Sequence, residues 1–207
     1  MTPLYVLGAG GHGKVVLSTL LECGYAVDGI LDDDKKKTGS LILGVPVVGT
    51  LGDLLSWDQP LRAVPGIGEN GTRKRVIERL SSASVEWLSV IHPRAYVHPS
   101  VQIGEGTVVF AGAVIQPDSR IGAHCIVNTG ALIDHDCVLA DFCHTAPGCS
   151  IAGSVLLGEG VFLGTGTSVI PGRSIGAWSI AGAGSTIVRD VPAGVTVVGT
   201  PAKPIQR

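Results

Sequence analysis

The second half of the chain repeats an apolar residue at every sixth position. The repeat runs for 102 residues without an insertion, and fifteen of its seventeen positions are Ile, Val or Leu. The seventeen positions are Ile91, Val97, Ile103, Val109, Ile115, Ile121, Val127, Ile133, Leu139, Thr145, Ile151, Leu157, Leu163, Val169, Ile175, Ala181 and Ile187. A period of six is typical of a parallel β-helix. We therefore expect each hexad to form one short strand and one corner, with the repeated residue pointing inward.

The first 90 residues follow another pattern. The strand-like segment PLYVL runs into Gly8, Gly10 and Gly13, and an apolar helix is expected from about Lys14 to Cys23. The further elements expected are strands near residues 26–31, 45–48, 62–67 and 87–91 and a helix near residues 73–80. Alternating strands and helices predict a small Rossmann-like α/β domain over residues 1–90, followed by an all-β helix over residues 91–207.

Composition and charge narrow the function classes. The chain has 207 residues, 30 of them glycine, a net charge of −2 and a mean hydropathy of +0.41. This composition excludes a disordered chain. The net charge gives no indication of binding to nucleic acid or to an acidic membrane surface. No apolar stretch is long enough to span a bilayer, and the opening segment has no basic region of a signal peptide. We expect a cytoplasmic protein without membrane insertion.

The scarcity of charge is uneven along the chain. Residues 1–90 hold 19 of the 32 charged side chains, whereas residues 91–192 hold 11 and no lysine. Four of the five cysteines, Cys125, Cys137, Cys143 and Cys149, occupy the same place in their hexads, where a tight corner requires a small residue. We interpret them as buried, reduced thiols, because their spacing is that of the repeat and not of a metal or redox motif.

The glycines of the first strand and turn match the pattern GxGxxG, and acidic residues follow the second strand about 20 residues later. Glycines let a backbone approach a phosphate at a helix N-terminus, and a carboxylate can accept a ribose hydroxyl. The segment is too short for two complete mononucleotide-binding halves, which favours a mononucleotide or nucleotide sugar over NAD. A purely structural glycine turn and a solvated LDDDKKK loop remain the alternatives.

The strings IGEGTV, IGAHCI, LGEGVF and IGAWSI resemble those of the hexapeptide-repeat acyltransferases. That resemblance implies a left-handed β-helix, a homotrimer, and acyl-CoA bound between neighbouring subunits. GAGGHG and LDDD ahead of the repeat are similar to the bacterial nucleotide-sugar N-acetyltransferases and the sialic acid O-acetyltransferase family. We refer to these related enzymes as the branch. Similarity to the branch implies transfer of acetyl from acetyl-CoA to the 4-amino group of a nucleotide-linked deoxy sugar, for surface glycan or glycoprotein synthesis.

Six histidines are candidates for the chemistry. We expect His92 and His98 to have capping or surface roles and His124 to be exposed. The segment ALIDHDCVLADFCH resembles the catalytic motif of the branch, which places the general base at His135 and its orienting carboxylate at Asp136. A neutral imidazole can take the proton of an amine that attacks a thioester, and the carboxylate fixes the tautomer.

The remaining site residues come from spacing and from the resemblance. Gly153 lies 18 residues after His135, one coil away, where its backbone N–H could stabilise an oxyanion. The resemblance places Asn128 beside the acceptor amine and assigns the other acetyl-CoA contacts to His144, Thr165, Ala183 and Lys203. For the nucleotide sugar it implies Gly10, Gly11, His12, Gly13, Asp32, Asp33 and Lys35.

Three rival functions differ from this hypothesis. A zinc hydrolyase of the γ-carbonic anhydrase type needs three converging histidines, and the six histidines show no such spacing, so we expect no metal. A trimeric scaffold that only binds a sugar nucleotide would not need the His135–Asp136 pair. O-acetylation of the sialic acid type remains the alternative within the acetyltransferases. The sequence leaves open which nucleotide and which sugar are bound.

Overall fold

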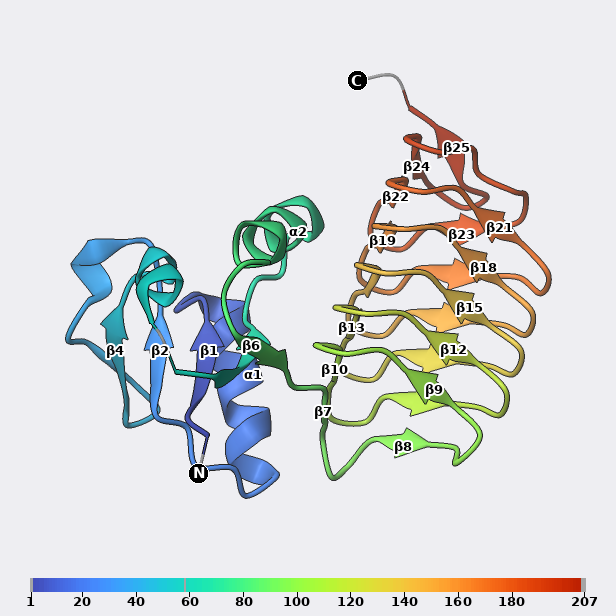
Figure 1. Ribbon diagram of the computed structural model, residues 1–207. Helices are drawn as coiled ribbons and strands as arrows, with labels where there is room; N and C mark the ends of the chain where they lie inside the picture. The colour runs from blue at the N-terminus through green and yellow to red at the C-terminus, as the bar shows by residue number, and fades with distance from the viewer. Residues whose placement is uncertain (1, 58, 206–207) are drawn as a thin grey trace. The chain divides into compact units, whose positions relative to one another are not determined.

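The computed structural model describes residues 2–57 and 59–205, which divide into two compact units with the boundary between His92 and Pro93 (Figure 1). In the first unit the strands are β1 (Leu4–Leu7), β2 (Gly29–Leu31), β3 (Leu41–Ile42), β4 (Val45–Gly49), β5 (Leu61–Pro65) and β6 (Val85–Trp87). The helices are α1 (Gly11–Glu22) and α2 (Asn70–Arg79), with short 3-10 helices at Lys35–Lys37 and Leu51–Ser56.

The sheet of the first unit has the order β3-β4-β2-β1-β5-β6 and is parallel apart from β3. The five parallel strands therefore follow the order 3-2-1-4-5 of a Rossmann-like fold, with the turn after β1 at the switch point where such folds bind ligands. One prediction was wrong in detail. Helix α1 begins at Gly11 and not at Lys14, because the extended Gly10 is its N-cap and the glycines form the first helical turn.

The second unit is a parallel β-helix of two-residue strands. Its first face contains β10 (Val108–Val109), β13 (Ile126–Val127), β16 (His144–Thr145), β19 (Phe162–Leu163), β22 (Ile180–Ala181), β24 (Thr196–Val198) and the antiparallel β25 (Lys203–Pro204). The second face contains β8 (Tyr96–Val97), β11 (Val114–Ile115), β14 (Leu132–Ile133), β17 (Ser150–Ile151), β20 (Ser168–Val169) and β23 (Thr186–Ile187). The third contains β9 (Gln102–Ile103), β12 (Arg120–Ile121), β15 (Val138–Leu139), β18 (Leu156–Leu157) and β21 (Ser174–Ile175). Strand β7 (Val90–Ile91) precedes them.

Strands on one face pair with a register of 18 residues, as in Ile115 with Ile133 and Leu139 with Leu157. The repeated residues from Val109 to Ile187 are at most 3% exposed and form one continuous core. This confirms the expected parallel β-helix and its inward-pointing position. Ile91, however, is 42% exposed, so the prediction is wrong at the start of the repeat, where no earlier coil of the helix covers the residue.

The corners are tight and use left-handed backbone. The residue three positions after the repeated apolar residue is usually a glycine with positive φ. Residues with a side chain take this positive φ at Asp118, His124, Asp136, Phe142, Ser154 and Trp178. The four corner cysteines are buried and free, as expected, and their thiols donate to carbonyl oxygens of the next coil. His124 is buried rather than exposed, because its ring stacks on Phe142 of the next coil at 5.3 Å. His92 is buried too, whereas His98 is half-buried and contacts Ser100.

Candidate active site

His135 lies at the corner between the second and third faces, two residues after the end of β14. Its Nδ1 is 2.8 Å from Oδ2 of Asp136, and both side chains are more than half exposed. Asp136 has φ +57°, and this left-handed backbone turns its carboxylate toward the preceding ring. The aspartate therefore reaches the histidine. In the neutral ring, Nδ1 donates to the carboxylate and Nε2 is left to accept a proton.

The surroundings favour the charged form of this ring. The hydrogen bond to Asp136, followed by the charge of Asp134, raises the pKa of His135 above its ordinary value of 6.5. Asp134 also accepts the backbone N–H of His135 at 2.8 Å. Sequence reasoning missed Asp134, because an acidic residue beside a histidine in the chain is equally common on a solvated corner.

Gly153 lies against the His135 ring, one coil further along. A Cβ at Gly153 would come within 2.5 Å of Cε1 and 2.7 Å of Nε2 of His135, so only glycine leaves room for the ring in this position. The backbone carbonyl of Gly153 accepts from Gly172, and among the described residues no acceptor faces its N–H. The structure thus brings together the predicted base, its carboxylate and the predicted backbone donor.

Asn128 and His144 lie elsewhere, on the first face. They are one coil apart, and Nδ2 of Asn128 is 3.1 Å from Nε2 of His144. His144 is buried, and its ring meets Phe162 edge to face with the ring centroids 5.1 Å apart. Within one chain these two residues and His135 therefore belong to different sides of the β-helix. Sequence reasoning did not predict that Asn128 and His144 contact each other.

Three further predicted residues lie toward the C-terminal end of the β-helix. Thr165 and Ala183 occupy the corner after the first face in successive coils, where Gly184 donates to the Thr165 carbonyl at 2.8 Å. Lys203 lines a cavity of about 350 Å³ that also contains Arg189. Arg189 was missed in the sequence because it falls at an ordinary exposed position of its hexad.

The glycines of the first unit divide into two kinds. A Cβ at Gly13 would lie 1.9 Å from the Gly8 carbonyl oxygen, and Gly8 itself has φ +114° beside Gly66. These two glycines are required by the close packing of the turn. Gly10 and Gly11, in contrast, have open space where a Cβ would lie. The N-terminus of α1 therefore presents an unobstructed backbone with no acidic residue in its first turn.

His12 directly follows Gly11, and its side chain lies beside the turn after β5. A Cβ at Gly68 would be 3.5 Å from the His12 side chain, which shows how closely the two turns approach. Burial, followed by the positive charge of Arg73, lowers the pKa of His12 to about 4. Arg73 is 1% exposed and donates to the carbonyls of Ile67 and Gly68. His12 is thus neutral at physiological pH.

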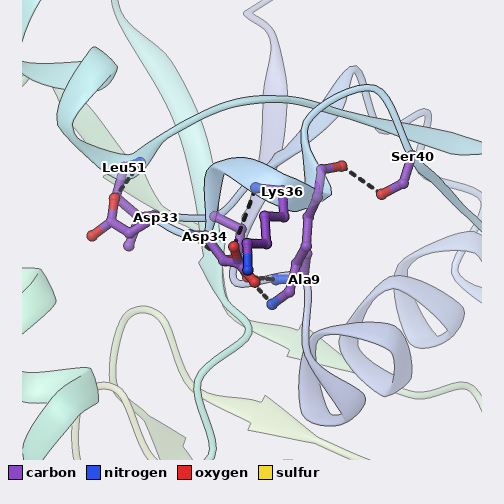
Figure 2. A network of polar contacts seen from close by, with 8 residues as sticks. Ala9, Asp33, Asp34, Lys36, Ser40 and Leu51 are labelled. Atoms are coloured by element: carbon purple, nitrogen blue, oxygen red, sulfur yellow. Dashed lines mark hydrogen bonds and ion pairs between the residues drawn. The ribbon is translucent and has the colours of Figure 1, made fainter.

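The acidic residues after β2 bind parts of their own chain (Figure 2). Asp32 accepts the Ala9 backbone N–H at 2.7 Å and pairs with Lys37 at 2.9 Å. Burial opposes ionisation of Asp32, but the hydrogen bonds from Lys37 and Ala9 outweigh it and lower its pKa. Asp33 accepts from the Leu51 backbone at 3.0 Å and pairs with Arg79. Lys35 begins the following 3-10 helix, so the salt bridge to Asp32 uses Lys37 instead.

Two family models match the two units. Residues 3–80 match the PglD N-terminal domain, and residues 100–135 match the bacterial transferase hexapeptide model of six repeats. A perosamine N-acetyltransferase variant from Caulobacter crescentus, solved with CoA and GDP-perosamine, is 42% identical with a TM-score of 0.93. That match covers 100% of this chain and 98% of the other. The acetyltransferase domain of PglB from Neisseria gonorrhoeae, solved with acetyl coenzyme A, is 40% identical with a TM-score of 0.91, covering 98% of each chain.

A curated relative, UDP-N-acetylbacillosamine N-acetyltransferase of Bacillus subtilis, is 42% identical over 115 residues, which is 54% of this chain and 52% of the relative. An uncharacterised protein of Acanthamoeba polyphaga mimivirus is 35% identical over 107 residues, 21% of its length. The chain thus spans about half or less of the curated relatives that it matches.

An α/β unit with an open glycine turn, joined to a β-helix with a histidine–carboxylate corner, defines a two-unit hexapeptide transferase. The chain belongs to the hexapeptide-repeat transferases with a PglD-type N-terminal domain, the family of the N-acetyltransferases named above. This confirms the resemblance seen in its motifs. No helix in the described part of the chain is long and apolar enough to cross a membrane, and within it no three His, Cys, Asp or Glu side chains are grouped to hold a metal.

Proposed function

We propose that this protein transfers the acetyl group of acetyl-CoA to the 4-amino group of a nucleotide-linked deoxy sugar, with His135 as the general base. The observation that carries the proposal is the exposed His135–Asp136 pair against the bare backbone of Gly153. The relatives solved with CoA, acetyl coenzyme A and GDP-perosamine support the substrate class.

In the proposed reaction, the neutral sugar amine attacks the thioester carbonyl, and Nε2 of His135 takes the proton that the amine loses. The carbonyl π electrons move to the oxygen, where the Gly153 N–H stabilises the oxyanion. When the intermediate collapses, the C–S bond breaks and the imidazolium returns its proton to the CoA thiolate. Asp136 stabilises the imidazolium in between, so no covalent acyl-enzyme is needed.

The nucleotide sugar binds in this proposal at the glycine turn of the first unit. Gly10 and Gly11 leave the N-terminus of α1 open for the phosphates, and His12 supplies a neutral hydrogen-bonding group. Asp32 and Asp33 use only part of their acceptor capacity within the chain, so each can also accept a hydroxyl or base N–H of the ligand. Gly13 has the packing role described above, and Lys35 remains a proposed ligand contact.

Acetyl-CoA is proposed to contact His144, Thr165 and Ala183, with its phosphates near the C-terminal cavity. Lys203 and Arg189 give that cavity two positive charges, and only Asp190 among its lining residues is acidic. Two cations that converge on one cavity favour a phosphate ligand more than a solitary lysine does.

We propose a homotrimer as the functional unit. Large apolar side chains are exposed on the second and third faces, including Leu132, Val138, Leu156 and Ile170. Exposed apolar patches of this kind mark interaction surfaces. Because His135 and His144 lie on different sides of one β-helix, the two histidines can share one acetyl group only if a corner of one copy meets the first face of another. Reduced cysteines suit the cytoplasm, where we place this enzyme of surface glycan or glycoprotein synthesis.

The test is an acetyl-transfer assay with purified protein. Acetyl-CoA would be incubated with UDP-, GDP- and dTDP-linked 4-amino sugars, while released thiol and acetylated product are followed by colorimetry and mass spectrometry. Each amino sugar would be matched by the same nucleotide sugar with a hydroxyl at C4, and sialic acid would be a separate arm. We expect turnover with at least one amine and with none of the hydroxyl analogues. Turnover of sialic acid alone, or binding without turnover, would overturn the proposal.

A further inference from the structure

The contact between Asn128 and His144 determines more than the proximity of two polar side chains. His144 opens β16, in register with Ile126 of β13 on one side and Phe162 of β19 on the other. Asn128 follows β13, so its side chain reaches across one coil to Nε2 of His144 at 3.1 Å. The ring is therefore flanked by two apolar side chains and held at one nitrogen by an amide.

The orientation of that amide is fixed by a second hydrogen bond. The backbone N–H of Thr129 donates to Oδ1 of Asn128 at 2.8 Å. Since a backbone N–H can only donate, the oxygen of the amide must face Thr129 and the NH₂ group must face His144. An NH₂ group in turn can only donate, so Nε2 of His144 is the acceptor in this contact.

This chain of donors selects one form of the ring. A neutral imidazole carries a single N–H, and if Nε2 accepts, that hydrogen is on Nδ1. A charged ring, or the other neutral tautomer, would direct an Nε2–H against the N–H groups of Asn128. The edge-to-face contact with Phe162, at an interplanar angle of 74°, further limits rotation of the ring.

We propose that Asn128 is a positioning residue that holds His144, the residue proposed to contact acetyl-CoA, in the neutral tautomer with hydrogen on Nδ1. The inference rests on the proposed function, which places acetyl-CoA at His144. It assigns Asn128 to the acetyl-CoA half of the reaction, whereas the family resemblance placed it beside the acceptor amine.

The tautomer can be measured directly from the ring nitrogen chemical shifts of ¹⁵N-histidine-labelled protein, with His144→Gln used to assign the signals. In the wild type at pH 7 to 8 we expect a protonated Nδ1 and an unprotonated Nε2. Asn128→Asp keeps the shape but replaces the NH₂ donor by an acceptor, and should move hydrogen onto Nε2. Asn128→Ala should lose the fixed preference. A wild-type ring protonated on Nε2, or shifts unchanged in Asn128→Asp, would overturn the inference.

Steady-state kinetics give the second readout. In Asn128→Asp we expect kcat/KM for acetyl-CoA to fall about tenfold, the effect of about one hydrogen bond, with KM for the nucleotide sugar within twofold of wild type. A raised KM for the nucleotide sugar with unchanged acetyl-CoA kinetics would show that Asn128 acts on the acceptor. Glu86→Gln, an exposed change on β6 of the first unit, is the control and should match wild type.

Folding and function can be separated in these variants. Asn128 also satisfies the Thr129 N–H, so thermal unfolding of each variant would be recorded, and Asn128→Asp retains an acceptor for that bond. If no nucleotide sugar supports turnover, the proposed function fails, but the nitrogen shifts still decide the tautomer. If turnover is found and the shifts contradict the tautomer, only this inference fails.

Discussion

His12 of the first unit and His135 of the β-helix lie in opposite electrostatic surroundings. Burial and the neighbouring Arg73 lower the pKa of His12 to about 4. The hydrogen bond to Asp136 and the charge of Asp134 raise the pKa of the exposed His135. One ring is kept neutral and the other is prepared to accept a proton. The glycine-turn histidine is therefore suited to hydrogen bonding with a ligand, whereas the corner histidine is suited to acid–base chemistry.

The largest expected effect is on catalysis. His135→Ala should reduce kcat in the thiol-release assay by about 10² to 10⁴, because it removes the proposed general base. His12→Ala should mainly raise KM for the nucleotide sugar. If His135→Ala keeps the wild-type rate while His12→Ala abolishes turnover, the roles assigned to the two histidines are wrong. Unchanged far-UV circular dichroism would serve as the folding control.

The low pKa of His12 should also appear as acid sensitivity. Its folded pKa lies below the unfolded value of 6.5, so the unfolded chain binds the proton more readily. The contribution of the neutral His12 to the free energy of unfolding is therefore fully present above about pH 6.5. It is lost as pH falls toward 4, by about 3 kcal/mol for this shift. Urea unfolding at pH 7 and pH 4 should show a smaller acid loss in His12→Asn than in wild type. Equal losses in both proteins would contradict a neutral, partly buried His12.

The glycines of the first unit offer a test of packing against ligand access. Gly13→Ala should lower the free energy of unfolding by about 2 to 3 kcal/mol, because its Cβ would collide with the Gly8 carbonyl. Gly11→Ala is the matched control, at an open helical position where alanine fits, and should leave stability equal or slightly higher. Chemical denaturation measures both. A Gly13→Ala protein as stable as wild type would show that the turn can relax.

The smallest expected change concerns the carboxylate of the corner. Asp136→Asn should lower kcat/KM by on the order of tenfold, since a charged acceptor becomes a neutral one. The general base works only when deprotonated, so its raised pKa places the acidic limb of the pH–rate profile above 6.5 in wild type. The variant should shift that limb to lower pH. A limb that does not move would mean that Asp136 does not set the pKa of His135.

Sequence reasoning predicted the β-helix because one repeated apolar residue fixes its period, its coil length and its core at once. The resemblance of the segment around His135 to a known catalytic motif indicated the His135–Asp136 pair, and the 18-residue coil predicted that Gly153 lies close to His135. Sequence reasoning did not find the Asn128–His144 contact. These residues are 16 apart rather than 18, so whether they touch depends on the directions in which their side chains leave the backbone. The exposure expected for His124 was wrong, because stacking on Phe142 is a contact between side chains that no period describes.

The N-terminal unit shows the same limit. The spacing of Gly8, Gly10 and Gly13 predicted a turn that suits phosphate, yet only the packing distances separate the glycines that close the turn from those that leave it open. The salt bridge of Asp32 to Lys37 rather than to Lys35 likewise follows from the 3-10 helix that starts there.

The architecture of this protein and the chemical groups available to it follow from its amino-acid sequence, because periodic burial and backbone-permissive glycines are local properties of the chain. The protonation state and contacts of each group depend on the fold. Burial beside Arg73, exposure beside Asp136 and the donor relay from Thr129 through Asn128 to His144 set which histidine is neutral, which accepts a proton and which nitrogen carries hydrogen. Those properties depend on distances of a few ångströms between residues that only folding brings together.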